Sequence, residues 1–93
     1  MLPSAVAQAR LRVTVALAAL PAGDRITFPW LQQLLGISAG NLSTNLRKLE
    51  DAGYVEITET HQRRTRVTYV TLSGRGWRVF AGYQAALRTL LAE

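Results

Sequence analysis

Residues 36–55, GISAGNLSTNLRKLEDAGYV, contain the strongest structural pattern in this 93-residue chain. Leucines recur in it at i, i+4 and i+7, a spacing that places side chains on one face of an α-helix. These leucines are Leu42, Leu46 and Leu49. Ser38 is a favourable N-cap, and Gly53 is a favourable residue for ending a helix. The stretch therefore predicts a helix over Ala39–Ala52 with one buried stripe.

A shorter helix is predicted immediately upstream. Pro29 favours the first turn of a helix and Gly36 ends one, so we expect a helix over Trp30–Leu35. Its leucines fall on one face and are Leu31, Leu34 and Leu35. A tight turn, Gly36–Ser38, joins this helix to the next. Two short helices connected in this way form a candidate helix-turn-helix.

Downstream, two segments have the β-branched and aromatic composition that is typical of strands. They are Tyr54–Thr60 and Arg66–Leu72, and the basic loop His61–Thr65 lies between them. Strand, short loop and strand predict an antiparallel hairpin. A short extended piece, Arg25–Phe28, is predicted ahead of the helix-turn-helix.

Longer helices are expected at both ends of the chain. A first helix is predicted over about Ser4–Leu20, and Ser73 can cap a last helix over about Gly74–Ala92. The element order is then helix, short strand, helix, helix, two-stranded hairpin, helix. This order predicts a single α+β domain over residues 1–93, mostly α, with the winged helix-turn-helix architecture.

Positive charge is concentrated in the last third of the chain. The formal net charge is +5, and 48% of the residues are apolar, enough to form a globular core. Residues 1–60 carry equal numbers of basic and acidic side chains, whereas residues 61–93 carry six arginines and one glutamate. This asymmetry favours a polyanionic partner, above all nucleic acid.

Several function classes lack the residues that they require. The chain has no cysteine and one histidine, His61, so we expect no metal site and no metal sensing. Glu50 and Asp51 are adjacent and point to different faces, so they form no general acid–base pair, and we expect neither enzymatic activity nor a cofactor. No run approaches the roughly 20 apolar residues of a membrane-spanning helix, and the first residues lack a signal peptide's basic region. A cytoplasmic protein without a membrane partner is expected.

Three stretches of the chain resemble a known family. They are residues 28–38, FPWLQQLLGIS, residues 40–55, GNLSTNLRKLEDAGYV, and residues 72–77, LSGRGW. Together they are similar to the small single-domain winged-helix transcriptional regulators related to the MarR and ArsR groups, over about residues 10–91. The resemblance implies a homodimeric DNA-binding regulator whose terminal helices dimerise. Two departures affect helix starts: Pro29 stands where the family commonly has a small polar cap, and Gly74-Arg75 replaces a usual proline–acidic pair.

The helix over residues 39–52 is the candidate DNA reader. A major groove about 12 Å wide admits one α-helix, whose short polar side chains near the N-terminus read base edges. Asn41 can pair bidentately with adenine, whereas Asn45 sits at the edge of the buried stripe and is a weaker candidate. Arginines in the hairpin suit phosphates or a narrow minor groove. The candidate DNA-binding residues are Ser38, Gly40, Asn41, Ser43, Thr44, Arg47, Lys48, Arg63, Arg64 and Arg66.

Both terminal helices are apolar on more sides than one small core can cover. We expect them to pair with the same helices of a second chain and form a homodimer. The candidate interface residues are Val13, Leu17, Phe80, Tyr83, Leu87, Leu90 and Leu91. The larger aromatic residues are interpreted as core or interface, and a site for a small-molecule effector between the dimerising helices is left open. These aromatic residues are Trp30, Trp77, Phe80 and Tyr83.

The favoured function is sequence-specific binding of double-stranded DNA by a homodimeric transcriptional regulator, a repressor that acts by occlusion. One alternative is a winged-helix module for protein–protein assembly without DNA binding. A docking surface of that kind would be more apolar than the polar helix start and basic hairpin of this chain. A small hydrolase or nuclease is a further alternative, and the missing acid, base and metal ligands disfavour it.

Overall fold

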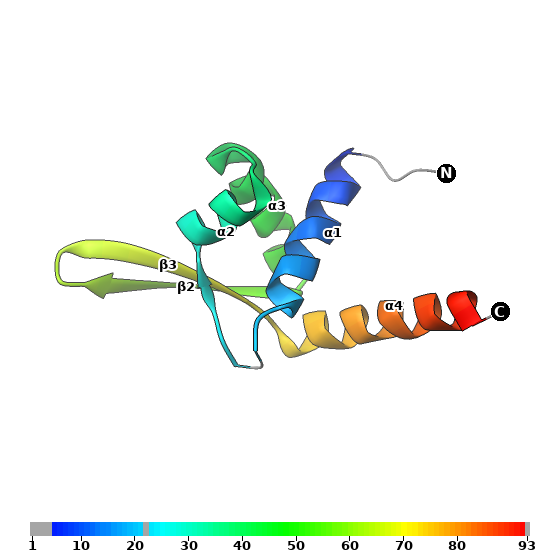
Figure 1. Ribbon diagram of the computed structural model, residues 1–93. Coiled ribbons are helices and arrows are strands. Elements are labelled where there is room, and N and C mark those ends of the chain that lie inside the picture. Colours follow the sequence, from blue (N-terminus) through cyan, green and yellow to red (C-terminus); the bar gives the residue numbers. More distant parts are fainter. Residues whose placement is uncertain (1–4, 22, 93) are drawn as a thin grey trace.

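Four helices and three strands make up the part of the chain that a computed structural model describes, residues 5–21 and 23–92 (Figure 1). The helices are α1 (Ala5–Ala18), α2 (Phe28–Leu35), α3 (Ala39–Asp51) and α4 (Gly74–Ala92). The strands are β1 (Ile26–Thr27), β2 (Val55–Gln62) and β3 (Thr65–Leu72), which form one antiparallel sheet in the order β1-β3-β2. The expected element order and the mostly helical winged-helix fold are confirmed. The helix start expected at Ser4 lies outside the described residues.

Helix α1 lies at the centre of the hydrophobic core, where it contacts α2, α3, α4 and β3. Val13 and Leu17, which the sequence placed at the dimer interface, are 0% and 1% exposed within their own chain. This part of the interface prediction is corrected, because α1 turns the face bearing these two residues toward its own domain. The apolar residues of α1 that face outward are instead Leu11 and Val15, which are 40% and 49% exposed.

The helix-turn-helix begins earlier than the sequence predicted. Thr27 caps α2, accepting a hydrogen bond at its hydroxyl from the Trp30 amide at 3.4 Å, so the polar cap stands two residues before Pro29. Gly36, at φ 65°, ends the helix in the left-handed region that favours glycine. The Arg12 guanidinium donates to the last carbonyl of α2, that of Leu35, at 2.6 Å. This bond ties α1 to the end of α2 and holds the helix-turn-helix against the core.

The exposed faces of α2 and α3 differ in polarity: α2 exposes a leucine, whereas the exposed face of α3 is polar. Leu31 and Leu35 of α2 are buried as expected, but Leu34, predicted on the same face, is 63% exposed. The leucine stripe of α3 is buried throughout, and the Ser38 hydroxyl accepts from the Asn41 amide at 3.1 Å, which confirms the predicted N-cap. The polar face of α3 is therefore turned to solvent.

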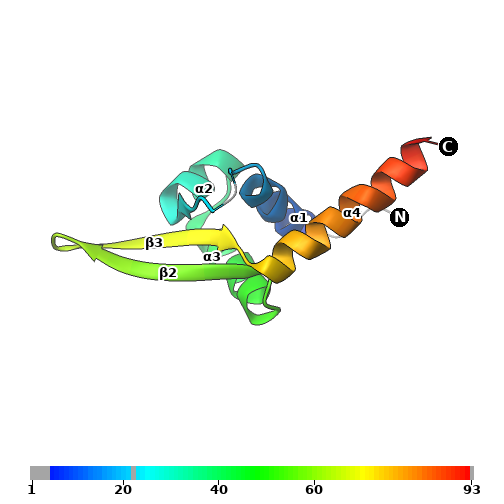
Figure 2. The ribbon, with the colours of Figure 1, turned by 90° about the horizontal axis from the view of Figure 1, so that it is seen from below.

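The hairpin is longer and its turn tighter than predicted. Strand pairing continues to Gln62 opposite Thr65, so Arg63 and Arg64 alone form the turn. His61, expected in the loop, lies instead in β2 opposite Arg66. Arg63 has φ 60°, a left-handed conformation that a two-residue hairpin turn commonly requires at a central position. The hairpin, called the wing below, extends away from the helices (Figures 1 and 2).

Helix α4 starts at a tight junction with the beginning of β2. The Ser73 hydroxyl accepts from the Gly76 amide at 3.0 Å and donates to the Gly53 carbonyl, which confirms the predicted cap. From there α4 runs away from the wing, toward the opposite end of the molecule (Figure 2). All of its residues from Ala81 to Ala92 are exposed. Within the described ranges, no helix has both the length and the apolarity needed to cross a membrane.

Candidate nucleic-acid interface

The outer face of the helix-turn-helix presents the predicted DNA-binding residues together. All seven are exposed, and they follow the N-terminal half and one flank of α3: Ser38, Gly40, Asn41, Ser43, Thr44, Arg47 and Lys48. Gly40 has open space where a side chain would stand, so a neighbouring backbone can approach it closely. The free amides of the first helical turn carry partial positive charge, which favours an anion such as phosphate there. The face combines hydrogen-bonding groups at its start with two cations farther along.

Of the residues of α3, Asn45 is the one whose burial was predicted least well from the sequence. It is 5% exposed, and its side-chain amide donates to the Asn41 carbonyl oxygen at 2.9 Å and to Asn41 Oδ1 at 2.6 Å. Asn45 thus takes a buried position next to the leucine stripe, and its side chain is hydrogen-bonded to Asn41. The i, i+4 spacing of two asparagines on a helix is the signal that could have identified this pair.

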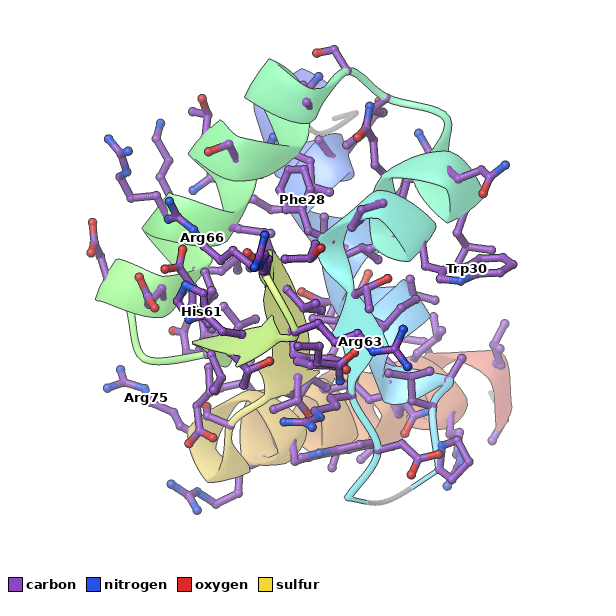
Figure 3. All side chains as sticks on the ribbon, turned by 90° about the vertical axis from the view of Figure 1, so that its left-hand side faces the viewer. Phe28, Trp30, His61, Arg63, Arg66 and Arg75 are labelled. Carbon is purple, nitrogen blue, oxygen red and sulfur yellow. The ribbon has the colours of Figure 1, made fainter. Side chains whose placement is uncertain are left out.

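The wing carries the predicted arginines Arg63, Arg64 and Arg66, all of them exposed. Figure 3 looks along the wing from its tip, with α2 and α3 above it, and shows Arg63 at the turn and Arg66 on β3. Arg66 forms an ion pair with Glu59 at 3.3 Å, and the two side chains are 64% and 54% exposed. An exposed pair of this kind contributes little to stability. Arg63 and Arg64 are therefore the cations at the tip, whereas Arg66 is already partnered.

A groove of about 360 Å³ separates α3 from the wing. Its walls carry Arg47 and Glu50 from α3 and Glu59 from β2, so the charge in the groove is mixed. Because strand residues alternate between faces, Glu59 and Arg66 share the side of the wing that faces α3. A phosphate that approached Arg66 from this side would compete with the Glu59 carboxylate.

We predict that Glu59→Gln raises affinity for random duplex DNA, because it releases Arg66 to bind a phosphate. The slope of log K against log salt should steepen by roughly 0.9 if Arg66 then neutralises one phosphate. Glu56→Gln is the matched control, since Glu56 is exposed on the opposite face of the same strand. Fluorescence anisotropy over a salt series measures both variants, and equal slopes for the two would contradict the release of Arg66.

Sequence reasoning missed Arg25, which the short strand β1 brings beside the wing. Its guanidinium lies 3.8 Å from the centre of the Tyr69 ring, and the Tyr69 hydroxyl accepts from Gln62 at 3.2 Å. This cluster occupies the face of the sheet away from α3, because Tyr69 alternates with the buried Val70. The extended piece was predicted but its pairing with β3 was not, so the position of Arg25 could not be inferred.

A second groove, of about 450 Å³, lies between α1, α3 and α4 and is lined mainly by apolar atoms. Phe80 and Tyr83 line it, together with Leu11 and Val79. Two of the four aromatic residues considered for an effector site thus meet here, whereas Trp30 lies on α2 and is 66% exposed. In the part of the chain that the structure describes, no cluster of three or more potential metal ligands occurs.

Comparison with known proteins identifies the class of this domain. A family profile described as the winged helix DNA-binding domain matches residues 10–91, and the chain belongs to this family. Its fold is that of MarR-family transcriptional regulators. No curated protein sequence matches the chain.

Three solved structures illustrate the similarity. A transcriptional regulator homologue from Pyrococcus horikoshii OT3 superposes with a TM-score of 0.79 at 22% identity, over 91% of this chain and 81% of that one. Streptococcus pneumoniae FabT, solved in complex with DNA, has a TM-score of 0.68 at 20% identity, over 91% and 56% of the chains. A MarR family regulator from Silicibacter pomeroyi has a TM-score of 0.68 at 20% identity, over 89% and 53%. The chain thus spans just over half the length of the last two proteins.

Proposed function

We propose that this protein is a transcriptional regulator that binds double-stranded DNA as a homodimer, with α3 in the major groove and the wing against the neighbouring backbone or minor groove. The proposal rests on one observation: the polar start of α3 and the arginine tip of the wing are both exposed to solvent. The major groove of B-DNA admits one α-helix, and a basic hairpin beside that helix can contact the adjoining backbone or minor groove. FabT, which has the same fold, was solved in complex with DNA, and this supports DNA binding by the fold.

The dimer part of the proposal rests on α4. Its apolar stripe includes Tyr83, Leu87 and Leu90, which are 56%, 46% and 68% exposed. The charged side chains of α4 lie on other faces of the helix, because residues advance by about 100° each. Leu11 and Val15 of α1 add exposed apolar surface in place of Val13 and Leu17. Such surfaces are typical of interfaces, and a second copy of the chain would cover them.

We propose repression by occlusion, because a bound dimer would block access to its site. A DNA-binding regulator acts in the compartment that holds the DNA, which we expect to be the cytoplasm. An effector would fit the groove lined by Phe80 and Tyr83, since it joins α3 to α4 and its apolar walls suit a small molecule. The alternative of an assembly module without DNA binding is less well supported, because the surface of α3 and the wing is polar and basic.

The test of DNA binding is the double variant Arg63→Ala with Arg64→Ala. It should weaken binding to specific and random duplexes by similar factors, because interactions with phosphate carry little sequence information. The slope of log K against log salt should flatten by roughly 0.9 for each phosphate that the variant no longer neutralises. Arg88→Ala is the control, since it removes an arginine from the far end of α4 and should leave the slope unchanged. An unchanged slope in the double variant would show that the wing does not contact the DNA phosphates.

A further inference from the structure

We infer that Asn45 is a positioning residue for Asn41 and that the pair makes the start of α3 a hydrogen-bond donor that prefers guanine over adenine. The inference rests on the proposed function, because it concerns how the same helix would read DNA. The two side chains lie one helical turn apart. Asn41 is exposed at the start of α3, and Asn45 is 5% exposed beneath it.

A backbone carbonyl determines the orientation of the Asn45 side-chain amide, and the orientation of the Asn41 amide then follows from that of Asn45. Asn45 Nδ2 lies 2.9 Å from the Asn41 carbonyl oxygen, an atom that can only accept a hydrogen bond, so the NH₂ group of Asn45 must be the one on this side. The same Nδ2 lies 2.6 Å from Asn41 Oδ1. If Asn41 placed its amide nitrogen at this position, two hydrogen-bond donors would face each other. Asn41 must therefore turn its side-chain oxygen toward Asn45. Its Nδ2 group is left as the part of the amide available to solvent.

This orientation changes what Asn41 can read. Bidentate pairing with adenine requires Asn41 Oδ1 to accept from adenine N6 while Nδ2 donates to N7. With Oδ1 turned toward Asn45, one of its two lone pairs is already engaged, and pairing with adenine would need the other to reach N6 while the amide stays in this orientation. Adenine is therefore disfavoured. Guanine instead presents two acceptors, N7 and O6, at the same edge of the major groove. A group that offers N–H alone therefore fits guanine best.

The position of Asn45 in the core indicates that its amide contributes something other than stability. It takes a place in the buried stripe beside Leu42, Leu46 and Leu49. Its Oδ1 atom is buried and receives no hydrogen bond from the residues that the structure describes. A buried acceptor left in this way is unfavourable, and a leucine of similar size would avoid the cost. Positioning of Asn41 accounts for a polar residue at this site.

The experiment is selection of bound sequences from random duplexes with four proteins: the wild type, Asn41→Ala, Asn45→Leu and the double variant. The base pair that Asn41 contacts is the one whose preference disappears in Asn41→Ala. We expect the wild type to prefer guanine over adenine there by at least about fivefold. Asn45→Leu should reduce that ratio to within about twofold, because Asn41 is then free to rotate and pair with adenine. The double variant should match Asn41→Ala.

Two controls separate positioning from a general structural effect. Thr44→Ala alters the neighbouring exposed residue and should keep the guanine preference at the base pair contacted by Asn41. Asn45→Leu should melt at or above the wild-type temperature by circular dichroism, so a loss of base preference would not reflect unfolding. If Asn45→Leu does not fold, Asn45→Ala removes the same donor without adding a larger side chain.

Each outcome bears on the inference. Adenine preference in the wild type, an unchanged ratio in Asn45→Leu, or no affected base pair in Asn41→Ala would overturn it. Selection of no sequence by the wild type would instead contradict the proposed function, so failures of the two proposals are distinguishable. A guanine preference that depends on Asn45 would support the inference.

Discussion

Replacing Leu87 and Leu91 by aspartate should convert the proposed dimer into a monomer and reduce operator affinity toward the non-specific level. Both side chains lie on the exposed apolar stripe of α4, at 46% and 78% exposure. Burial of a leucine contributes roughly 1.5–3 kcal/mol, and the symmetric interface would lose each residue twice. A monomer binds one half-site, so specific binding should fall by about 10³-fold or more, the usual gap between specific and non-specific affinity.

The matched control is Ala85→Asp with Thr89→Asp. These positions have the same i, i+4 spacing and are exposed, but they lie about 120–160° around α4 from Leu87 and Leu91. The control adds the same charge to the same helix and should remain dimeric. Analytical ultracentrifugation distinguishes the two variants. A dimer in the Leu87 and Leu91 variant would refute this interface, and a monomeric wild type at micromolar concentration would refute the dimer itself.

The central helices could be predicted from the sequence because their signals are local. The leucine stripe of α3, the cap at Ser38 and the glycines at both helix ends each specify a conformation without reference to distant residues. The cap at Ser73 and the full extent of α4 are predicted for the same reason. The positions of the exposed polar residues of α3 follow directly, since a buried stripe fixes which side of the helix faces solvent.

The features that were predicted wrongly depend on tertiary contacts. Apolar residues surround α1, so periodicity could not show that Val13 and Leu17 face the domain's own core while Leu11 and Val15 face outward. The wing turn was predicted too long because Gln62 and Thr65 are polar, yet strand pairing extends to them.

In the candidate site, too, local features could be predicted from the sequence and features that depend on tertiary contacts could not. Exposure of the α3 residues and of the wing arginines was predictable from patterns within each element. The pairing of Arg66 with Glu59 across two strands, and the stacking of Arg25 on Tyr69, require the register of the sheet. Register is set by which residues enter the core, and no single segment of sequence contains that information.

The junction between β2 and α4 should be the backbone position that is most sensitive to substitution. A Cβ atom on Gly76 would overlap the carbonyl oxygen of Tyr54 and would lie 3.0 Å from a methyl carbon of Leu72. The Tyr54 oxygen cannot move freely, because it accepts the hydrogen bond from the Ser73 amide at 3.0 Å. Leu72 is itself 5% exposed in the core.

We therefore expect Gly76→Ala to lower the free energy of unfolding by about 3 kcal/mol, at the upper end of the usual cost of overpacking. For a domain of this size, the melting temperature should fall by roughly 10–25 °C. Gly82→Ala is the control on the same helix, since the added methyl group meets open space and alanine favours the helix by up to about 1 kcal/mol. Thermal and urea denaturation followed by circular dichroism measure both variants. A Gly76→Ala protein that melts with the wild type would show that α4 can shift away from Tyr54, and the direction of α4, on which the proposed dimer depends, would then not be fixed by this junction.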